Sequence, residues 1–461
     1  MMQEAKSYDR IGGPESADEL EGMDRLFDRL FPITRSIAGP GVRDTLAILN
    51  EHVPLEIIGV PSGTRVFDWV VPREWHIEEA WIKDAEGRTI VDFRDHNLHV
   101  VNFSTAVDRV MSLEELRPHL YTVPHLPDAI PYVTSYYKER WGFCLSQRQL
   151  DELRPGLYHV RIRSEHVDGE LNIGQAVLPG ESEEEVLIST YICHPSMANN
   201  ELSGPIVAAF LYNRLKNWPA RRFTYRFVWL PETIGSITYL YLHGDELKRK
   251  LVAGLVLTCL GGDHVLHYKK SRRGDAPLDR LIEHLFRQTI PGRTVPFTPI
   301  HGSDERQYNS PGFNLPVGQL NRTLTPGFAG YHTSLDTKES MGIDRLYQSL
   351  NEIESILQAF EHDGYYINTR PFGEVKLDKY GLYPDINSRT TTRHSSNELA
   401  DGRKQLNRIL TILNYADGEH SLHDIADKCG ASLPELVPLV QKLKGLGLLR
   451  GPYSRPRGLF E

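Results

Sequence analysis

The chain has little cysteine and lacks any long hydrophobic run. Its 461 residues include 4 cysteines, which lie far apart and form no C-x-x-C pair. That spacing argues against a disulfide framework and favours reduced thiols, so we expect a cytoplasmic protein. No apolar stretch approaches the roughly 20 residues of a membrane-spanning helix, so the sequence predicts no membrane partner.

Positive charge is also scarce. Lysine and arginine number 52 against 61 aspartate and glutamate residues, which gives a net charge of −9. An acidic chain of this kind is a poor general ligand for nucleic acids and anionic membranes. The start of the chain is polar and acidic, unlike a signal peptide, and we expect residues 1–19 to be disordered.

What the chain does have is the length and composition of a multidomain globular protein. It is 40% hydrophobic and 25% charged, and 461 residues exceed one ordinary core. The hydrophobic pattern predicts a core at 20–54 and 105–398, a small β domain inserted at 55–104, and a C-terminal module at 399–461.

Strand-like and helix-like segments alternate through the second half of the core. Such alternation predicts an α/β fold, an α/β/α sandwich with a mostly parallel sheet. The expected strands cover 186–192, 225–230, 251–260 and 315–320. The expected helices cover 206–215, 236–248, 278–289 and 343–360.

The C-terminal module has the pattern of a winged helix. Three helices are expected: one at 405–415, a second that begins after Ser421 as its N-cap, and a third at 433–444. A short wing is expected at 445–451. Such modules often bind DNA, but the last helix carries two prolines, a glutamate and only two lysines. A protein contact, including a homo-oligomer through this module, is therefore the better interpretation, and nucleic acid is disfavoured.

Three potential ligands or bases stand at expected strand ends and in a loop. His194 follows the strand at 186–192, Glu232 follows the strand at 225–230, and His332 lies among Gly, Tyr and Thr residues. Sites of open α/β sheets form at the carboxyl edge, where these side chains can meet. A hydrolytic zinc centre needs such ligands from separate elements, an open position for water, and a carboxylate to take the proton.

Each of these residues also has a structural interpretation. A lone histidine after a strand is often structural, and Glu232 can serve only to complement the dipole of the next helix. Cys193, beside His194, raises the alternative of a catalytic thiol, although a free cysteine is usually a small buried hydrophobe. Asp336, four residues after His332, is expected to orient that histidine by accepting a hydrogen bond.

Several segments together resemble a known family. They are 193–204, 231–240, 302–308, 311–316 and 331–336. The chain resembles zinc aminopeptidases of the phosphorylase/hydrolase-like α/β/α fold. More closely, it resembles a bacterial aminopeptidase-like group that adds an inserted β domain and a winged-helix tail, and that often occurs among polysaccharide or secondary-metabolite biosynthesis proteins. The resemblance implies a zinc hydrolase of an amide or peptide bond.

The chain departs from the aminopeptidase pattern at the metal ligands. The resemblance implies zinc on His194 and an aspartate that bridges two zinc ions, but the aligned residue is Asn200, with Glu201 beside it. Thr258 stands near a further family aspartate, for which Asp263 could compensate. Only one glutamate stands where the family usually has two. We therefore expect a single zinc.

The expected zinc ligands are His194, His332 and a carboxylate, with Glu232 as the catalytic base or a further ligand. Glu201 is preferred to Asn200 as the third ligand, because an anion offsets the charge of zinc and an amide does not. If Glu201 points away, the alternative is two histidines with Glu232 and weaker metal binding.

Substrate contacts are expected from Asp304, Arg306 and Tyr331, close to the metal. Arginine can hold a carboxylate or phosphate through a bidentate contact, so Asp304 or Arg306 would anchor a charged substrate end. The alternative is an internal salt bridge that holds the loop.

Two classes of function therefore compete. The leading interpretation is a zinc-dependent hydrolase whose substrate is a peptide or a small molecule, such as an acylated amino sugar or metabolite. The alternative is a non-catalytic binding or scaffold protein on an aminopeptidase fold, favoured by the depleted ligand set and the winged-helix tail. A DNA-binding regulator ranks third because the chain is acidic.

Overall fold

The computed structural model describes residues 14–323, 328–383 and 396–459. The chain forms two compact units. The large unit contains the chain up to Arg273 together with Val295–Asn351, and the small unit contains Gly274–Thr294 and Glu352–Glu461. Within the described ranges, no helix has the length and apolar character needed to span a bilayer.

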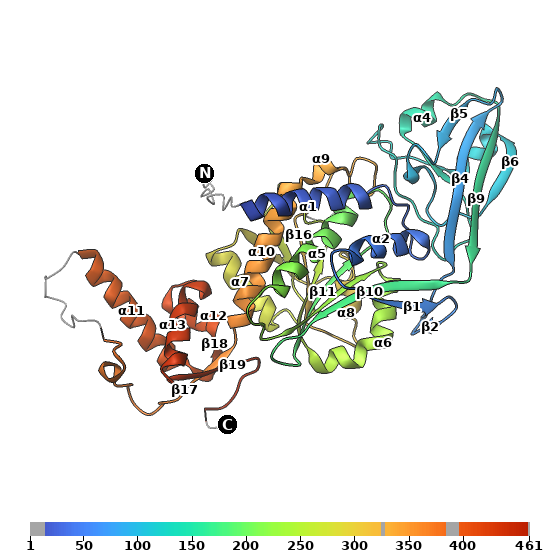
Figure 1. Cartoon of the computed structure of the whole chain (residues 1–461). Coiled ribbons are helices and arrows are strands. Elements are labelled where there is room, and N and C mark those ends of the chain that lie inside the picture. The colour runs from blue at the N-terminus through green and yellow to red at the C-terminus, as the bar shows by residue number, and fades with distance from the viewer. Residues whose placement is uncertain (1–13, 324–327, 384–395, 460–461) are drawn as a thin grey trace. The chain divides into compact units, whose positions relative to one another are not determined.

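Seven strands of an eight-stranded mixed sheet form the centre of the large unit (Figure 1). In sheet order the strands are β1 (Glu56–Pro61), β10 (Glu170–Leu178), β12 (Thr224–Leu230), β11 (Glu185–Tyr191), β13 (Leu251–Leu257), β16 (Val317–Asn321), β14 (Leu266–Lys269) and β15 (Gly292–Val295). The neighbours β12, β11, β13 and β16 are parallel. The pairs β1–β10, β10–β12 and β14–β16 are antiparallel. β11 is buried along its whole length, as a central parallel strand requires.

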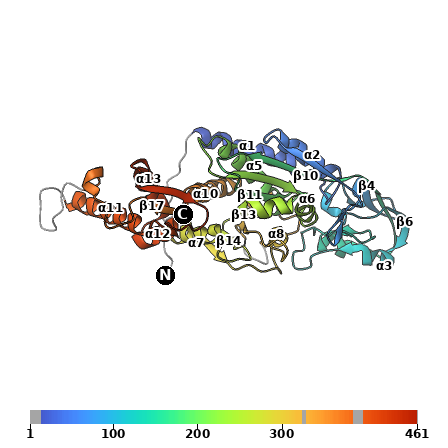
Figure 2. The ribbon, with the colours of Figure 1, turned by 90° about the horizontal axis from the view of Figure 1, so that it is seen from below.

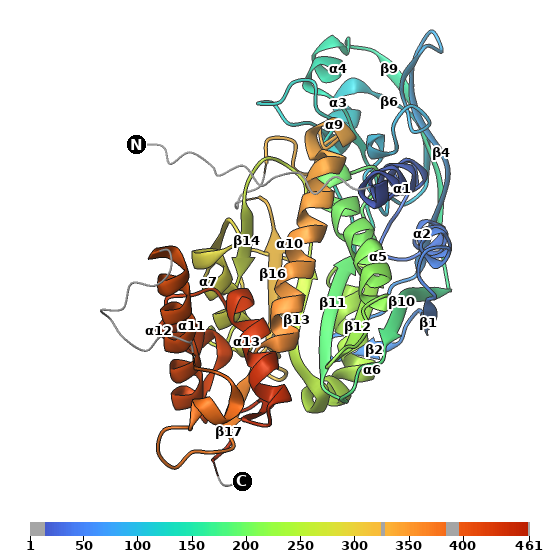
Figure 3. The same cartoon turned by 60° about the vertical axis from the view of Figure 1, so that its left-hand side comes forward.

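Helices cover both faces of this sheet. α5 (Ser203–Lys216) connects β11 to β12, and α6 (Ile234–Lys250) connects β12 to β13. β12 and β13 lie on opposite sides of β11, so the two connections run in opposite directions. Right-handed crossovers in opposite directions place their helices on opposite faces, and Figure 3 shows α5 in front of the sheet. The predicted α/β/α sandwich is confirmed.

The start of the described chain is helical. α1 spans Pro14–Leu30, so the expectation of disorder over 1–19 is wrong for residues 14–19, while 1–13 lie outside the described residues. Within this segment Glu19 pairs with Arg214 of α5, at 2.9 and 2.5 Å, which ties the start of the helix to the large unit. Local composition did not reveal that distant partner. α2 (Pro40–Asn50) follows.

A separate antiparallel sheet of four strands also belongs to the large unit. Its order is β5 (Thr89–Asp92), β4 (Glu74–Asp84), β9 (Leu157–Val167) and β6 (Val107–Ser112). Figures 1 and 2 show it apart from the central sheet. The boundaries expected for a β domain at 55–104 differ from this arrangement. β1 joins the central sheet, and β6 and β9 come from beyond residue 104, because long-range pairing rather than local periodicity selects the partners.

The small unit contains the winged helix. α11 (Ser396–Tyr415), α12 (Leu422–Cys429) and α13 (Leu433–Gly445) accompany a sheet in the order β18 (Asp417–Ser421), β17 (Tyr365–Asn368) and β19 (Leu449–Tyr453). Ser421 caps α12, as expected. The boundary at residue 399 was placed too late, because β17 is the middle strand of this sheet although it precedes α11 by almost thirty residues.

The remaining elements are short, apart from two helices. They are β2 (Arg65–Val66), β3 (Trp69–Val70), η1 (Asn97–His99), α3 (Leu113–Leu116), η2 (Arg117–His119), β7 (Leu120–Tyr121), β8 (Phe143–Cys144), α4 (Gln147–Glu152), η3 (Ala198–Leu202), α7 (Pro277–Gln288), α8 (Glu305–Tyr308), α9 (Lys338–Met341), α10 (Ile343–His362) and η4 (Leu377–Tyr380).

Candidate active site

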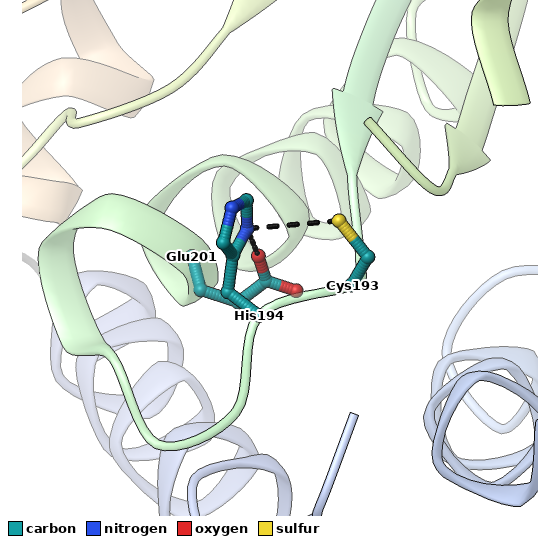
Figure 4. Close-up of side chains that lie close together, drawn as sticks. All are labelled: Cys193, His194 and Glu201. Atoms are coloured by element: carbon teal, nitrogen blue, oxygen red, sulfur yellow. Dashed lines mark hydrogen bonds and ion pairs between the residues drawn. The ribbon is translucent and has the colours of Figure 1, made fainter. Parts of the chain in front are cut away.

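His194 lies just past the end of β11 and is almost fully buried. Its Nδ1 is 2.7 Å from Oε2 of Glu201, which the π-helical turn η3 brings beside the ring (Figure 4). Its Nε2 is 3.6 Å from Oε2 of Glu232. A carboxylate on one ring nitrogen is the usual way in which proteins orient a metal-binding histidine, and it leaves the other nitrogen available.

A buried arginine faces the carboxylate of Glu201. Its Oε1 is 3.3 Å from Nε of Arg35, and both side chains are fully buried. Arg35 also donates hydrogen bonds to the carbonyl oxygens of His194 (2.8 Å) and Leu30 (2.7 Å). A cation bound directly to Glu201 would face the guanidinium at close range, which Coulomb repulsion opposes. This geometry disfavours the expected role of Glu201 as a zinc ligand and favours one as the acceptor that holds His194.

The neighbouring thiol is part of this cluster. Cys193 Sγ is 3.7 Å from Nδ1 of His194 and accepts a hydrogen bond from the backbone N–H of Glu232 at 3.2 Å. The ligand atoms of Cys193, His194 and Glu201 lie within 4.8 Å of one another, close enough to share a metal, but Arg35 opposes a cation there. Burial raises the pKa of Cys193 to about 11, so the thiol stays protonated at neutral pH, which argues against a catalytic nucleophile.

Glu232 stands at the open side of the cluster. It follows β12 and Pro231, and 26% of its side chain is exposed. Its Oε1 accepts a hydrogen bond from Ser303 Oγ at 2.6 Å. A carboxylate with one oxygen held and the other near an imidazole is suited to take a proton from a water molecule.

His332 reaches the same place from a loop. Its ring centroid is 5.7 Å from that of His194, and the Tyr132 ring lies 5.4 Å from His332 and 5.1 Å from His194. The backbone of His332 is left-handed (φ 56°), and its carbonyl oxygen accepts a hydrogen bond from the N–H of Tyr132 at 2.8 Å. Burial lowers the pKa of His332 to about 3, helped by His194, so its imidazole is neutral, the form that binds metals.

Asp336 does not orient His332. Its carboxylate accepts hydrogen bonds from the backbone N–H groups of Asn199 (2.7 Å) and Asn200 (2.9 Å), and its own carbonyl oxygen accepts one from Ala198 (3.1 Å). The expectation was wrong because the free N–H groups at the start of η3 are closer and stronger competitors than the ring. Asp336 therefore fixes the turn that presents the residues beside His194.

Asn200 has an unused acceptor. Its Nδ2 contacts Tyr191 Oη (3.2 Å) and Cys259 Sγ (3.8 Å), while its buried Oδ1 has no hydrogen-bond partner among the described residues. A buried polar atom without a partner is costly, so it commonly marks a place for a ligand, an ion or a water molecule.

Neither Thr258 nor Asp263 is placed to replace the aspartate ligand that the aminopeptidase resemblance implies. Thr258 Oγ1 is 2.6 Å from the hydroxyl of Tyr191. Asp263 pairs with Arg345 at 3.0 Å, and its side chain is 91% exposed. The suggestion that Asp263 compensates for Thr258 is therefore wrong, because the solvent-facing pair draws that carboxylate away.

Asp304 has a different place from the one expected. It is fully buried, and its Oδ1 accepts hydrogen bonds from the N–H of Thr233 (2.7 Å) and from Ser236 Oγ (2.6 Å). Burial, with the charge of Glu232, raises the pKa of Asp304 to about 8. Thr233 has a positive φ (64°) in a tight turn that the N–H of Ile234 closes onto the carbonyl oxygen of Glu232 (2.8 Å), so Asp304 stabilises this turn rather than offering a surface to substrate.

Arg306 and Tyr331 remain candidates for substrate contact. Arg306 Nε donates a hydrogen bond to the carbonyl oxygen of Ser303 at 3.0 Å. Burial raises the pKa of Tyr331, Glu232 adds to the rise, and Arg306 opposes it, so these groups lie within electrostatic range of one another. Tyr331 stacks on His332 with centroids 4.0 Å apart.

The expected internal salt bridge of this loop involves other residues. Lys269 Nζ is 2.6 Å from Oε1 of Glu305, and both side chains are buried. Lys269 also donates to the carbonyl oxygen of Thr298 at 2.6 Å. The pair holds the loop and leaves Arg306 outside it.

Sequence reasoning missed Arg35, Tyr132 and Ser303 as parts of the site. Arg35 precedes His194 by 159 positions, and Tyr132 comes from an aromatic, proline-rich segment. No spacing or strand end marks either residue. Ser303 lies in a segment that already carried the family resemblance, which is the signal that could have found it.

The fold and the site define an aminopeptidase-like α/β protein with a C-terminal winged helix. The structure of a zinc aminopeptidase from Bacillus subtilis aligns with a TM-score of 0.54 at 11% identity, over 74% of this chain and 94% of that one. At this identity the likeness shows the fold alone. A winged helix-turn-helix model matches residues 364–451.

The chain belongs to the family of the domain of unknown function DUF4910, whose model matches residues 24–363. A Clostridium acetobutylicum protein, named as a candidate polysaccharide biosynthesis protein with an aminopeptidase-like domain, is 42% identical over 425 residues, 92% of this chain and 95% of the relative. The crystal structure of a candidate peptidase from C. acetobutylicum aligns with a TM-score of 0.84 at 39% identity, over 95% of this chain and 97% of that one. The resemblance to an aminopeptidase-like group is confirmed.

Proposed function

We propose that this protein is a hydrolase of amide bonds that uses a single zinc ion. The observation that carries the proposal is the pair formed by Nε2 of His194 and the partly exposed carboxylate of Glu232, 3.6 Å apart, with the neutral ring of His332 beside them. Such a set of nitrogen and oxygen donors is the one that catalytic zinc sites use.

The residues present fit one metal ion better than two. His194, held at Nδ1, offers Nε2, and His332 is neutral. The unpartnered Oδ1 of Asn200 supports it as a weak additional donor. The carboxylate of Glu201 contacts Nδ1 of His194 and the guanidinium of Arg35, so Glu232 is the carboxylate left beside Nε2 of His194. We assign Glu232 as the base rather than a ligand, so the metal ligands are the two histidines, and this matches the weaker metal binding expected if Glu201 points away.

Glu232 serves as the proton carrier of the proposed reaction. When bound, zinc supplies a Lewis acid that polarises an amide carbonyl and makes a water molecule more acidic. Oε2 of Glu232 takes a proton from the attacking water and returns it to the leaving amine, while Ser303 holds Oε1 in place. Arg306 and Tyr331 bind the polar end of the substrate.

The substrate is a peptide or an acylated small molecule. The name of the C. acetobutylicum relative, which includes polysaccharide biosynthesis, supports testing N-acylated amino sugars beside aminoacyl amides. The test is release of a free amine by the zinc-loaded protein and by His194→Ala. We expect turnover of at least one class by the wild type and none by the variant. Equal turnover by both would refute the proposal.

A binding or scaffold role is the second candidate. It is favoured by the ligand set, since Asn200 and Thr258 stand where the aminopeptidase resemblance implies carboxylates. Tight binding of an acylated amino sugar without any hydrolysis would favour this role.

A further inference from the structure

Arg35 is a charged residue of the site that lies far from the other site residues in the sequence. It lies between α1 and α2, its side chain is fully buried, and its guanidinium reaches Glu201 and the backbone of His194. The nearest carboxylate is thus one that already contacts a proposed metal ligand. Arginine stays charged at any relevant pH, so it brings a permanent cation into this site.

The segment around Arg35 is fixed from several sides. The carbonyl oxygen of Arg35 accepts a hydrogen bond from Asn102 Nδ2 (2.8 Å), and Ser36 Oγ donates to Asn102 Oδ1 (2.6 Å). Ser196, two residues after His194, donates to the carbonyl oxygen of Phe31 (3.1 Å). The guanidinium is therefore held in place rather than drawn in by Glu201 alone.

The hydrogen bonds of the Arg35–Glu201 ion pair are incomplete, unlike those of a pair whose only role is stability. Arg35 Nη2 and Glu201 Oε1 have no hydrogen-bond partner among the described residues, although both are buried. Buried ion pairs contribute stability only when their remaining hydrogen bonds are satisfied. A pair that is incompletely satisfied in this way points to a role in the site.

We propose that Arg35 is a positioning residue for the metal centre. Its guanidinium lies 3.3 Å from the Glu201 carboxylate and 2.8 Å from the carbonyl oxygen of His194, so it holds Glu201 against Nδ1 of His194 and leaves Nε2 facing Glu232. This inference rests on the proposed function, since it assigns His194 as a ligand. Carboxylate partners of metal-binding histidines commonly change metal affinity about 10- to 100-fold, and here the effect passes through one more residue.

A structural role makes a different prediction. Arg35 donates to the carbonyl oxygens of Leu30 and His194, and these bonds need donors but not a charge. Arg35→Gln keeps donors and removes the charge, and Arg35→Lys keeps the charge and loses the planar fork. The two variants therefore separate the interpretations.

The experiment measures zinc affinity by competition with a chelator. We expect about 10-fold or greater weakening in Arg35→Gln and a smaller loss in Arg35→Lys. The double variant Arg35→Gln with Glu201→Gln should bind zinc no more weakly than Glu201→Gln alone, since both changes act through one contact. Arg226→Met, which breaks another buried pair (Arg226 with Glu185 at 2.6 Å), should leave affinity unchanged.

Wild-type affinity in a folded Arg35→Gln, or losses that multiply in the double variant, would overturn the inference. A second measurement needs no metal: crystal structures of the metal-free wild type and Arg35→Gln report the distance between Nδ1 of His194 and Oε2 of Glu201. We expect this contact at 2.7 Å in the wild type and a lengthened contact or a rotated ring in Arg35→Gln; an unchanged contact overturns the inference. If the wild type binds no zinc, the proposed function fails while this second readout still decides the role of Arg35. If Arg35→Gln fails to fold, the comparison uses Arg35→Lys and Glu201→Gln. Wild-type zinc affinity in a folded Arg35→Lys, or zinc binding by it that is weaker than in Glu201→Gln, would then contradict the inference.

Discussion

The two ends of strand β11 carry two buried arginine–glutamate pairs that are built differently. At its first residue, Glu185 holds Arg226 through two contacts of 2.6 and 2.9 Å, and the guanidinium also bonds Gln175 (3.3 Å) and Tyr239 (3.2 Å). Past its last residue, Arg35 and Glu201 approach to 3.3 Å, and each has one atom without a hydrogen-bond partner in the described part of the chain.

The difference separates stability from function within one strand. A satisfied ion pair at the amino end stabilises the sheet, because each polar atom lost from water is replaced by a partner. The pair at the carboxyl end is incomplete and stands next to His194, a partly exposed Glu232 and an orphan oxygen of Asn200. Unsatisfied groups gather where a ligand is to be bound, at the edge of the sheet where α/β proteins place their sites.

The largest effect is expected at the carboxyl end. Glu232→Gln removes the proton acceptor and should lower kcat/KM for amide hydrolysis by about 10²- to 10⁴-fold. Because the side chain is partly exposed, the free energy of unfolding should change little. Steady-state kinetics measures kcat/KM, and urea unfolding measures the free energy of unfolding. Full activity in Glu232→Gln would contradict a catalytic role for the carboxyl end of β11.

The opposite pattern is expected at the amino end. Arg226→Met leaves the buried Glu185 without its main cation and should lower the free energy of unfolding by about 3–5 kcal/mol. Hydrolysis per folded molecule and zinc affinity should stay at wild-type level. A stable Arg226→Met with reduced hydrolysis would show that the two ends are not independent.

Much of this comparison could be predicted from the sequence. The apolar runs gave the strands, and His194, Glu232 and His332 were placed at one edge because polar residues follow buried strands. Arg35 could not be predicted, because only tertiary packing brings it to a residue 159 positions away. Glu201 was expected to bind the metal, and the sequence did not reveal that Arg35 lies 3.3 Å from its carboxylate, for the same reason.

A smaller effect is expected from restoring charge at the carboxyl end. Asn200→Asp would add an anion where the structure has an unpartnered oxygen, and it should tighten zinc binding about tenfold by charge alone. Glu201→Gln should weaken binding instead, through the orientation of His194. Chelator competition measures both; unchanged binding in Glu201→Gln with tighter binding in Asn200→Asp would remove Glu201 from the site.

The smallest effect concerns pH. Asp304 has a folded-state pKa of about 8 against an ordinary value of 3.8, so between these values the folded state holds a proton that the unfolded state has released. Stability should therefore fall as pH rises through this window. Asp304→Asn removes this contribution, so its melting temperature should gain on the wild type between pH 5 and pH 8, on the order of a few degrees. Parallel pH profiles would contradict the assignment.

The most direct test of the central claim is the position of zinc in crystals of the zinc-loaded protein, measured by anomalous scattering at the zinc edge. The proposed site predicts one peak, in bonding contact with Nε2 of His194 and close to His332 and Glu232. A peak between Cys193 and Glu201, two peaks, or none at the carboxyl end of β11 after loading would contradict it.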